Sequence, residues 1–235
     1  MSRPVVVLLL LPLAGACGGH HDEGALRMAA DARHLLIATD NGVRLRPADG
    51  DRVQVDDRVD GHWAHHDDVW TLDLSCSDKA GDCPRMPYVD VPDDTSVTVT
   101  ARNAGVDVAG ISAALDVSTV NGDVTVTRSG DERAAVRLST RNGSVRATSL
   151  AAGRLHAATT NGDVTLSCTT APSRVAATTV NGSVDVTVPS DAPAYWITAT
   201  TDNGRVTTSV PTGHADRDRT MTLTTVNGDV GARRD

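Results

Sequence analysis

"STVNGDVTV" (residues 118–126) decides the fold, because nearly the same nine residues return five more times along the chain. The other copies are STRNGSVRA (139–147), ATTNGDVTL (158–166), TTVNGSVDV (178–186), TTDNGRVTT (200–208) and TTVNGDVGA (224–232). The successive asparagines are separated by 21, 19, 20, 22 and 24 residues. Self-similarity at a nearly fixed period of this size predicts a repeat architecture.

Each copy has the same internal pattern. A Thr lies two residues before the Asn and a Val lies three residues after it, and polar positions alternate with apolar ones on both sides. This predicts two alternating strands joined by a sharp bend. We assign a structural turn role to the bend residues and expect them to adopt positive φ, which Asn and Gly tolerate best. They are Asn121, Gly122, Asn142, Gly143, Asn161, Gly162, Asn181, Gly182, Asn203, Gly204, Asn227 and Gly228.

Two all-β architectures satisfy this pattern. Asn-Gly between alternating strands is typical of a type I′ hairpin, so a meander of hairpins is one solution. The other is a parallel β-solenoid with coils of about twenty residues, in which equivalent strands of successive coils pair. The residues that follow Asn-Gly favour the solenoid, because neighbouring copies never both carry an acid there and stacked like charges would repel. In order they are Asp123, Ser144, Asp163, Ser183, Arg205 and Asp229.

The N-terminus is typical of an export signal, with an apolar run that ends in the lipobox-like sequence LAGAC. We interpret residues 1–16 as a signal peptide, 17–31 as a tether lipidated at Cys17, 32–95 as an atypical N-terminal β capping region and 96–235 as the solenoid repeats. An ordinary signal peptide with an incidental Cys is the alternative. Lipidation would attach the protein to the extracellular face of the cytoplasmic membrane.

Export places the other cysteines in an oxidising compartment. Cys76 and Cys83 flank a short loop with Gly and Asp, so a local disulfide between them is expected. Cys168 would then be unpaired. It shares strand parity with Val164 and Leu166, which predicts a small buried hydrophobic residue rather than a reactive thiol.

Composition limits both the core and the partners. The chain of 235 residues has no Phe and only 2% aromatic residues, so Val, Leu, Ala and Thr must fill its interior. Its net charge of −8 argues against a nucleic-acid partner, because phosphate binding needs clustered cations. His62, His65 and His66, next to two Asp, match no closed zinc pattern, and we assign no metal and no cofactor.

The lipobox, a Trp-containing strand that ends in LDLSC, the segment YVDVP and the serial NGDV copies together resemble the bacterial "putative adhesin" family of β-strand-repeat proteins. The resemblance implies a β-helix-like envelope protein with no established catalytic residues. The function we expect first is a non-enzymatic cell-surface lipoprotein, an adhesin or envelope-binding scaffold, that binds a cell-wall polymer or an envelope protein. Two alternatives remain open. One is an envelope-stress or signalling accessory, and the other is a polysaccharide-active enzyme that uses Asp123 and Asp163, two coils apart.

Overall fold

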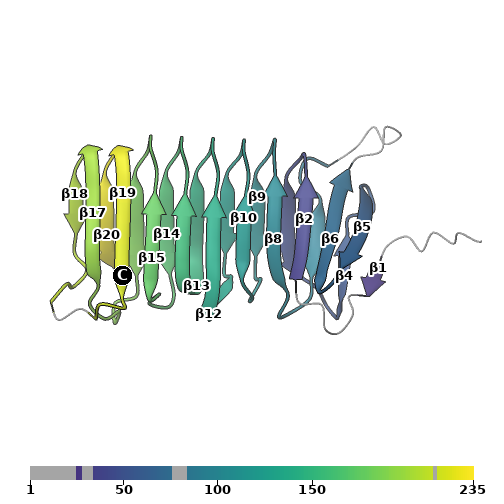
Figure 1. Ribbon diagram of the computed structural model, residues 1–235, viewed down its shortest axis with the longest axis horizontal. Coiled ribbons are helices and arrows are strands. Elements are labelled where there is room, and N and C mark those ends of the chain that lie inside the picture. The colour runs from purple at the N-terminus through teal and green to yellow at the C-terminus, as the bar shows by residue number, and fades with distance from the viewer. Residues whose placement is uncertain (1–24, 28–33, 76–83, 214–215) are drawn as a thin grey trace, which may run out of the picture.

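The computed structural model describes residues 25–27, 34–75, 84–213 and 216–235. In these ranges the chain forms only strands and the segments that connect them, and no helix there is long and apolar enough to cross a membrane. The strands build two facing layers, sheet A and sheet B, that run the length of a rod (Figure 1). The chain passes from sheet B to sheet A at each Asn-Gly bend.

Sheet B contains, in spatial order, β5 (Asp60–His66), β6 (Val69–Ser75), β2 (His34–Thr39), β8 (Ser96–Ala101), β10 (Leu115–Ser118), β12 (Gly130–Ser139), β13 (Val145–Ala158), β15 (Arg174–Thr178), β19 (Thr220–Asn227) and β17 (Trp196–Asn203). Sheet A contains β1 (Ala25–Arg27), β4 (Arg52–Val55), β7 (Tyr88–Val91), β3 (Val43–Pro47), β9 (Val106–Ala109), β11 (Val124–Thr127), β13, β14 (Val164–Cys168), β16 (Val184–Val188), β20 (Val230–Arg234) and β18 (Val206–Thr208). The long strand β13 belongs to both layers.

Equivalent strands of the repeats pair in parallel and in register. Val124 pairs with Val145, and Val145 pairs with Val164. The predicted parallel stacking is therefore confirmed, and the hairpin alternative is wrong for the repeats. Parallel stacking is favoured over hairpins because equivalent apolar residues of successive coils lie above one another. Each coil therefore extends the same continuous core.

The spatial order of the coils differs from the expected order. The final copy, β19 and β20, lies between the coil of β15 and β16 and the coil of β17 and β18. The expectation that successive coils pair is therefore wrong at this end, where the chain skips one rung and then returns to fill it. The two longest spacings between asparagines, 22 and 24 residues, fall at these two steps, because a connection that skips a rung needs extra chain.

The other end has a similar insertion. Strands β2 and β3 lie between the coil of β6 and β7 and the coil of β8 and β9. In the described part of the chain, antiparallel pairing is confined to this end, where β4 pairs with β1 and β7, and β5 pairs with β6. The described part of the segment 32–95 thus holds two coils of the parallel stack, β2 with β3 and β6 with β7, together with the antiparallel strands β4 and β5.

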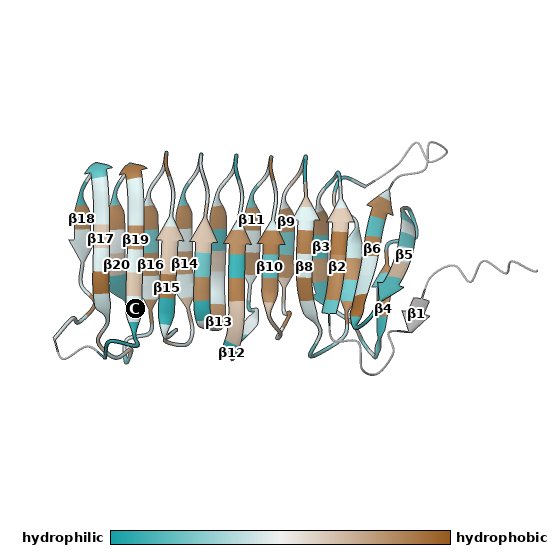
Figure 2. Cartoon of the chain, viewed as in Figure 1, coloured by the Kyte–Doolittle hydropathy of each residue, from teal (hydrophilic) through white to brown (hydrophobic). Residues whose placement is uncertain are grey.

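The core is thin and continuous between the layers. It consists mainly of Val, Leu and Ala with Thr at its edge, as the composition predicted, and Figure 2 shows hydrophobic and hydrophilic bands alternating along the strands. Cys168 is buried and unpaired, which confirms the prediction from its strand parity. Burial raises the pKa of its thiol to about 12. Tyr195 is the one large aromatic side chain that is fully buried among the described residues, and its hydroxyl donates to the carbonyl of Pro172 at 2.8 Å.

Candidate functional site

The asparagines of the bends form a continuous side-chain ladder on the exposed corner of the rod. Asn142 Nδ2 donates to Asn121 Oδ1 at 2.9 Å, and the same bond joins each later pair at 2.8–2.9 Å. The order along the ladder is Asn121, Asn142, Asn161, Asn181, Asn227 and Asn203. The four inner amides use both ends of their side chains along the stack, as in other parallel in-register assemblies.

The ladder explains why Asn recurs. The expectation that the asparagines of the bends adopt positive φ is wrong. No asparagine has positive φ among the described residues. Gly143, Gly162, Gly182 and Gly228 do, with φ of 147–153°. The glycines are also required by close approach, because a Cβ on Gly162 would lie 2.1 Å from the carbonyl oxygen of Gly143.

The recurring threonines tie each coil to the next. Thr140 Oγ1 donates to the carbonyl of Gly122 at 2.8 Å, and each of the five equivalent threonines makes a bond of the same length to the coil below it. Thr is therefore selected at this position because it satisfies a carbonyl that would otherwise be partly buried without a donor.

The residues after Asn-Gly form a third ladder. The backbone N–H of Ser144 donates to Asp123 Oδ1 at 2.7 Å, the N–H of Asp163 donates to Ser144 Oγ at 3.4 Å, and this alternation continues to Arg205. Short side chains with acceptor oxygens suit this position, and alternating Asp with Ser separates the negative charges. The inserted coil preserves this alternation, because Asp229 lies between Ser183 and Arg205.

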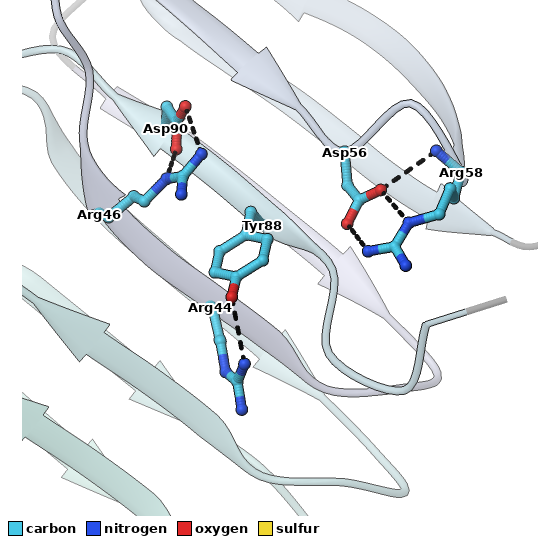
Figure 3. Close-up of polar contacts among 6 residues, drawn as sticks. All are labelled: Arg44, Arg46, Asp56, Arg58, Tyr88 and Asp90. Atoms are coloured by element: carbon cyan, nitrogen blue, oxygen red, sulfur yellow. Dashed lines mark hydrogen bonds and ion pairs between the residues drawn. The ribbon is translucent and has the colours of Figure 1, made fainter.

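A polar cluster near the N-terminal end of sheet A is fully paired (Figure 3). Arg46 binds Asp90, Arg44 donates to the Tyr88 hydroxyl at 3.4 Å, and both guanidinium groups lie against the Tyr88 ring. Nearby, Arg58 makes hydrogen bonds of 2.8 and 2.9 Å to Asp56.

The Arg58 hydrogen bonds lower the pKa of Asp56 to about 2. The adjoining recess has a volume of about 230 Å³. Because its charges neutralise one another, this cluster is suited to holding the end of the rod together.

The histidines of β5 do not converge. His62 and His66 lie on one face of the strand and His65 lies on the other, because side chains alternate along a strand. His65 stacks on Trp70 with a centroid distance of 4.4 Å. Within the described ranges, no group of three His, Cys, Asp or Glu side chains could hold a metal ion. Cys17, Cys76 and Cys83, predicted for lipidation and a disulfide, lie outside the described residues.

The outer face of sheet B carries a hollow of about 420 Å³ that crosses six neighbouring strands, from β2 through β8, β10, β12 and β13 to β15. Its charged and titratable lining residues are His34, Asp116, Arg137, Arg154, His156 and Arg174, and small alanines form part of its floor. We call this hollow the basic groove. Figure 2 shows hydrophilic bands on β12, β13 and β15 of this face.

The cations of the basic groove are unpaired. Arg154 and Arg174 occupy the same register on adjacent strands, and Arg137 pairs in register with His156. None of the three arginines has an ion pair or a hydrogen bond in the described part of the chain. Burial, followed by the positive charge of Arg137, lowers the pKa of His156. The face is therefore positive and open although the whole protein is acidic.

Sequence reasoning missed this groove, although a signal was present. When the copies are aligned on Asn, Arg154 and Arg174 both lie seven residues before it, and Arg137 and His156 both lie five residues before it. Alternation places these positions on the outer face, so like residues at one offset predict neighbours on the rod.

The sequence model of one family, Toastrack DUF4097, matches residues 73–232. The chain belongs to the Toastrack family. The family resemblance predicted from the sequence is thereby confirmed. No curated protein is significantly similar to this Toastrack chain.

Two solved structures are similar to this Toastrack protein. One is a "putative cell adhesion protein" from Clostridium sporogenes, with 9% identity and a TM-score of 0.41, covering 89% of this chain and 96% of that one. The other is a "putative adhesin" from Bacteroides fragilis, with 12% identity and a TM-score of 0.39, covering 90% of this chain and 95% of that one.

Proposed function

We propose that this Toastrack protein is an exported lipoprotein, anchored through Cys17 at the outer face of the cytoplasmic membrane, that acts as a non-enzymatic binding scaffold of the cell envelope. The observation that carries the proposal is the basic groove, an open surface with unpaired cations on a regular rod. The lipobox before Cys17 supports export and anchoring. The envelope is therefore where the partner is expected.

The construction of the rod supports a binding role. Side chains on adjacent strands are held about 4.8 Å apart by the backbone hydrogen bonds of the stack. Asn, Thr and Asp side chains add bonds along the same axis at the corner. A rigid surface of this kind pre-organises its side chains, which reduces the ordering cost when an extended partner binds.

The two acids considered for catalysis, Asp123 and Asp163, both accept hydrogen bonds from the backbone of a neighbouring coil. Asp123 accepts from the N–H of Ser144 and pairs with Arg146 at 3.2 Å, and Asp163 accepts from the N–H of Ser183 at 2.8 Å. Both lie on the exposed Asn-Gly corner, away from the basic groove. Glycoside hydrolysis needs two carboxyl groups that flank a bound sugar. This arrangement favours a structural role for the two acids over the enzyme alternative.

Anchoring is tested by replacing Cys17 in the full chain expressed in a bacterial host. Wild-type protein should partition into the detergent phase after membrane extraction, and Cys17→Ala should appear in the aqueous phase or stay uncleaved. Cys76→Ala leaves the lipobox intact and is the control, so it should partition like wild type. Identical aqueous partitioning of wild type and Cys17→Ala would refute the lipoprotein assignment.

Envelope binding without catalysis is tested with purified cell-wall fragments. The detergent-solubilised protein should co-sediment with the fragments and should release no new reducing ends from them during prolonged incubation. Release of reducing ends that disappears in Asp163→Asn would establish the enzyme alternative. The scaffold function would be contradicted if the protein stayed in the supernatant with wall fragments and Cys17→Ala, which has no acyl anchor, also stayed there with envelope membranes.

A further inference from the structure

We propose that the basic groove binds an extended polysaccharide that carries carboxylate groups, an inference that rests on the proposed scaffold function and names its ligand class. The ligand would lie along the rod axis, across the strands of sheet B. Its carboxylates would meet the arginines on β12, β13 and β15, and its neutral part would extend over β10, β8 and β2.

The shape of the groove favours a chain over a compact ligand. The six lining strands are consecutive neighbours in sheet B, so five strand spacings give the groove a length of about 24 Å. The volume of about 420 Å³ is spread along this length, which makes the groove shallow. A small metabolite would remain largely solvated there, whereas an extended polymer can contact several rungs at once.

The charge pattern identifies the ligand as an anion. Arg154 and Arg174 face each other across one strand spacing, and like charges in that arrangement repel. Several cations of sheet A are compensated, since Arg44 pairs with Asp107 at 3.2 Å and Arg146 pairs with Asp123 at 3.2 Å. A carboxylate placed between Arg154 and Arg174 would remove the repulsion and form charge-assisted hydrogen bonds.

The groove is not uniformly positive, which restricts where the anions bind. Asp116 on β10 lies in register with Arg137 on β12, so the cationic part begins at β12 and continues to β15. Beyond Asp116, His34 is hydrogen-bonded to Thr98 at 3.0 Å and Ser96 also lines the groove. Imidazole and hydroxyl groups are partners for sugar hydroxyls.

The floor of the groove favours a sugar backbone over a polyphosphate. Most of the groove surface is apolar, and small side chains lie beside the cations, since Ala135 is in register with Arg154 and Ala176 is in register with His156. The C–H faces of pyranose rings can pack on such a floor while their carboxylates reach the flanking cations. A linear polyphosphate has no apolar face, so it would leave this floor without a complementary surface.

The test measures binding of the detergent-solubilised full-length protein to oligogalacturonate by calorimetry at low and physiological salt. Wild type should bind, and its affinity should fall as salt rises, because fixed cations attract the ligand. Arg154→Gln combined with Arg174→Gln should weaken binding at least tenfold. Arg146→Gln is the matched control, because Arg146 lies on the same strand, β13, but on sheet A, and it should bind like wild type.

Three further ligands make the remaining outcomes decisive. Neutral dextran should not bind. Polyphosphate that binds more tightly than oligogalacturonate would overturn the choice of a carboxylated glycan. Vesicles with anionic lipid would also overturn it if they bind Cys17→Ala, which has no acyl anchor, more tightly than oligogalacturonate does. Equal binding by wild type and by the Arg154 and Arg174 variant would show that the groove is the wrong site. Failure of oligogalacturonate to bind, while wall fragments still co-sediment, would remove this inference and leave the scaffold function standing.

Discussion

Replacing Gly162 by Ala tests whether the stacked Asn-Gly corner needs glycine. Gly162 has φ of +150°, and an added Cβ would lie 2.1 Å from the carbonyl oxygen of Gly143 and 2.5 Å from its carbon. A residue with a side chain in such a strained conformation costs about 1–3 kcal/mol. Forcing the adjacent coils apart adds about 1–3 kcal/mol, as for other overpacked sites. The expected loss of stability is therefore about 2–6 kcal/mol.

Gly50→Ala is the matched control, because a Cβ there has no atom within 4 Å. Both substitutions restrict the unfolded chain equally, which stabilises by about 0.4–1 kcal/mol and cancels in the comparison. Urea unfolding followed by circular dichroism should show a much lower midpoint for Gly162→Ala, with Gly50→Ala at or above wild type. Midpoints that agree for the two variants would refute the close approach of the coils at this corner.

Three more predictions follow from single features of the rod. Deleting 216–235 should unfold the coil of β17 and β18, because in the described part of the chain these strands pair only with β19 and β20, whereas β15 and β16 keep β13 and β14 as neighbours; hydrogen exchange that shows β17 still protected would contradict the inserted order. The Cys168 thiol, with its pKa raised to about 12, should react with a maleimide only after denaturation, and rapid native labelling would show that it is accessible. Arg58→Gln should lower stability at neutral pH by no more than about 1 kcal/mol, because the Arg58 side chain is exposed and solvent screens the pair. This difference should shrink as the pH falls from 3.8 to about 2, because the Asp56 pKa is depressed by Arg58 in the folded state alone; acid titration of the unfolding midpoint measures it.

Much of the stack was predictable from the repeats, because a parallel rung needs the same residue type at the same offset. Thr two residues before Asn and Val three residues after it fulfil this condition in every copy. The role of Asn was misjudged, since its φ is ordinary and its amide ladder supplies the reason for its recurrence. A propensity argument about one bend cannot reveal a bond that exists only between bends.

The order of the coils could not be predicted from the corner itself. Asn181 would find the same ladder partner in Asn203 as in Asn227, so local chemistry does not separate the two orders. The connecting segments make the difference. The N–H of Trp196 donates to the carbonyl of Arg219, and the Arg219 side chain donates to the carbonyl of Ala171 at 2.9 Å. These contacts join residues far apart in sequence, and periodicity carries no information about them.

The basic groove was hidden for a related reason. Its arginines and histidines come from four different strands, and each is an ordinary outward-facing residue within its own strand. Their offsets from Asn contain the signal, but it has meaning only once the strands are known to stack in register. The inserted coil does not disturb the groove. In sheet B, β19 lies between β15 and β17, and the six lining strands end at β15.

Cysteine pairs on the asparagine ladder test the central claim, the parallel stack with its inserted final coil. Asn181 forms a parallel bridge with Asn227, so their Cα atoms lie about 4.8 Å apart, within the range of a disulfide. Asn181 and Asn203 are two rungs apart, at about 9.6 Å, which is too far. Peptide mapping of the oxidised full chain should find the cross-link in the double variant Asn181→Cys with Asn227→Cys. It should find none in Asn181→Cys with Asn203→Cys. A cross-link in the second variant and none in the first would contradict the inserted order.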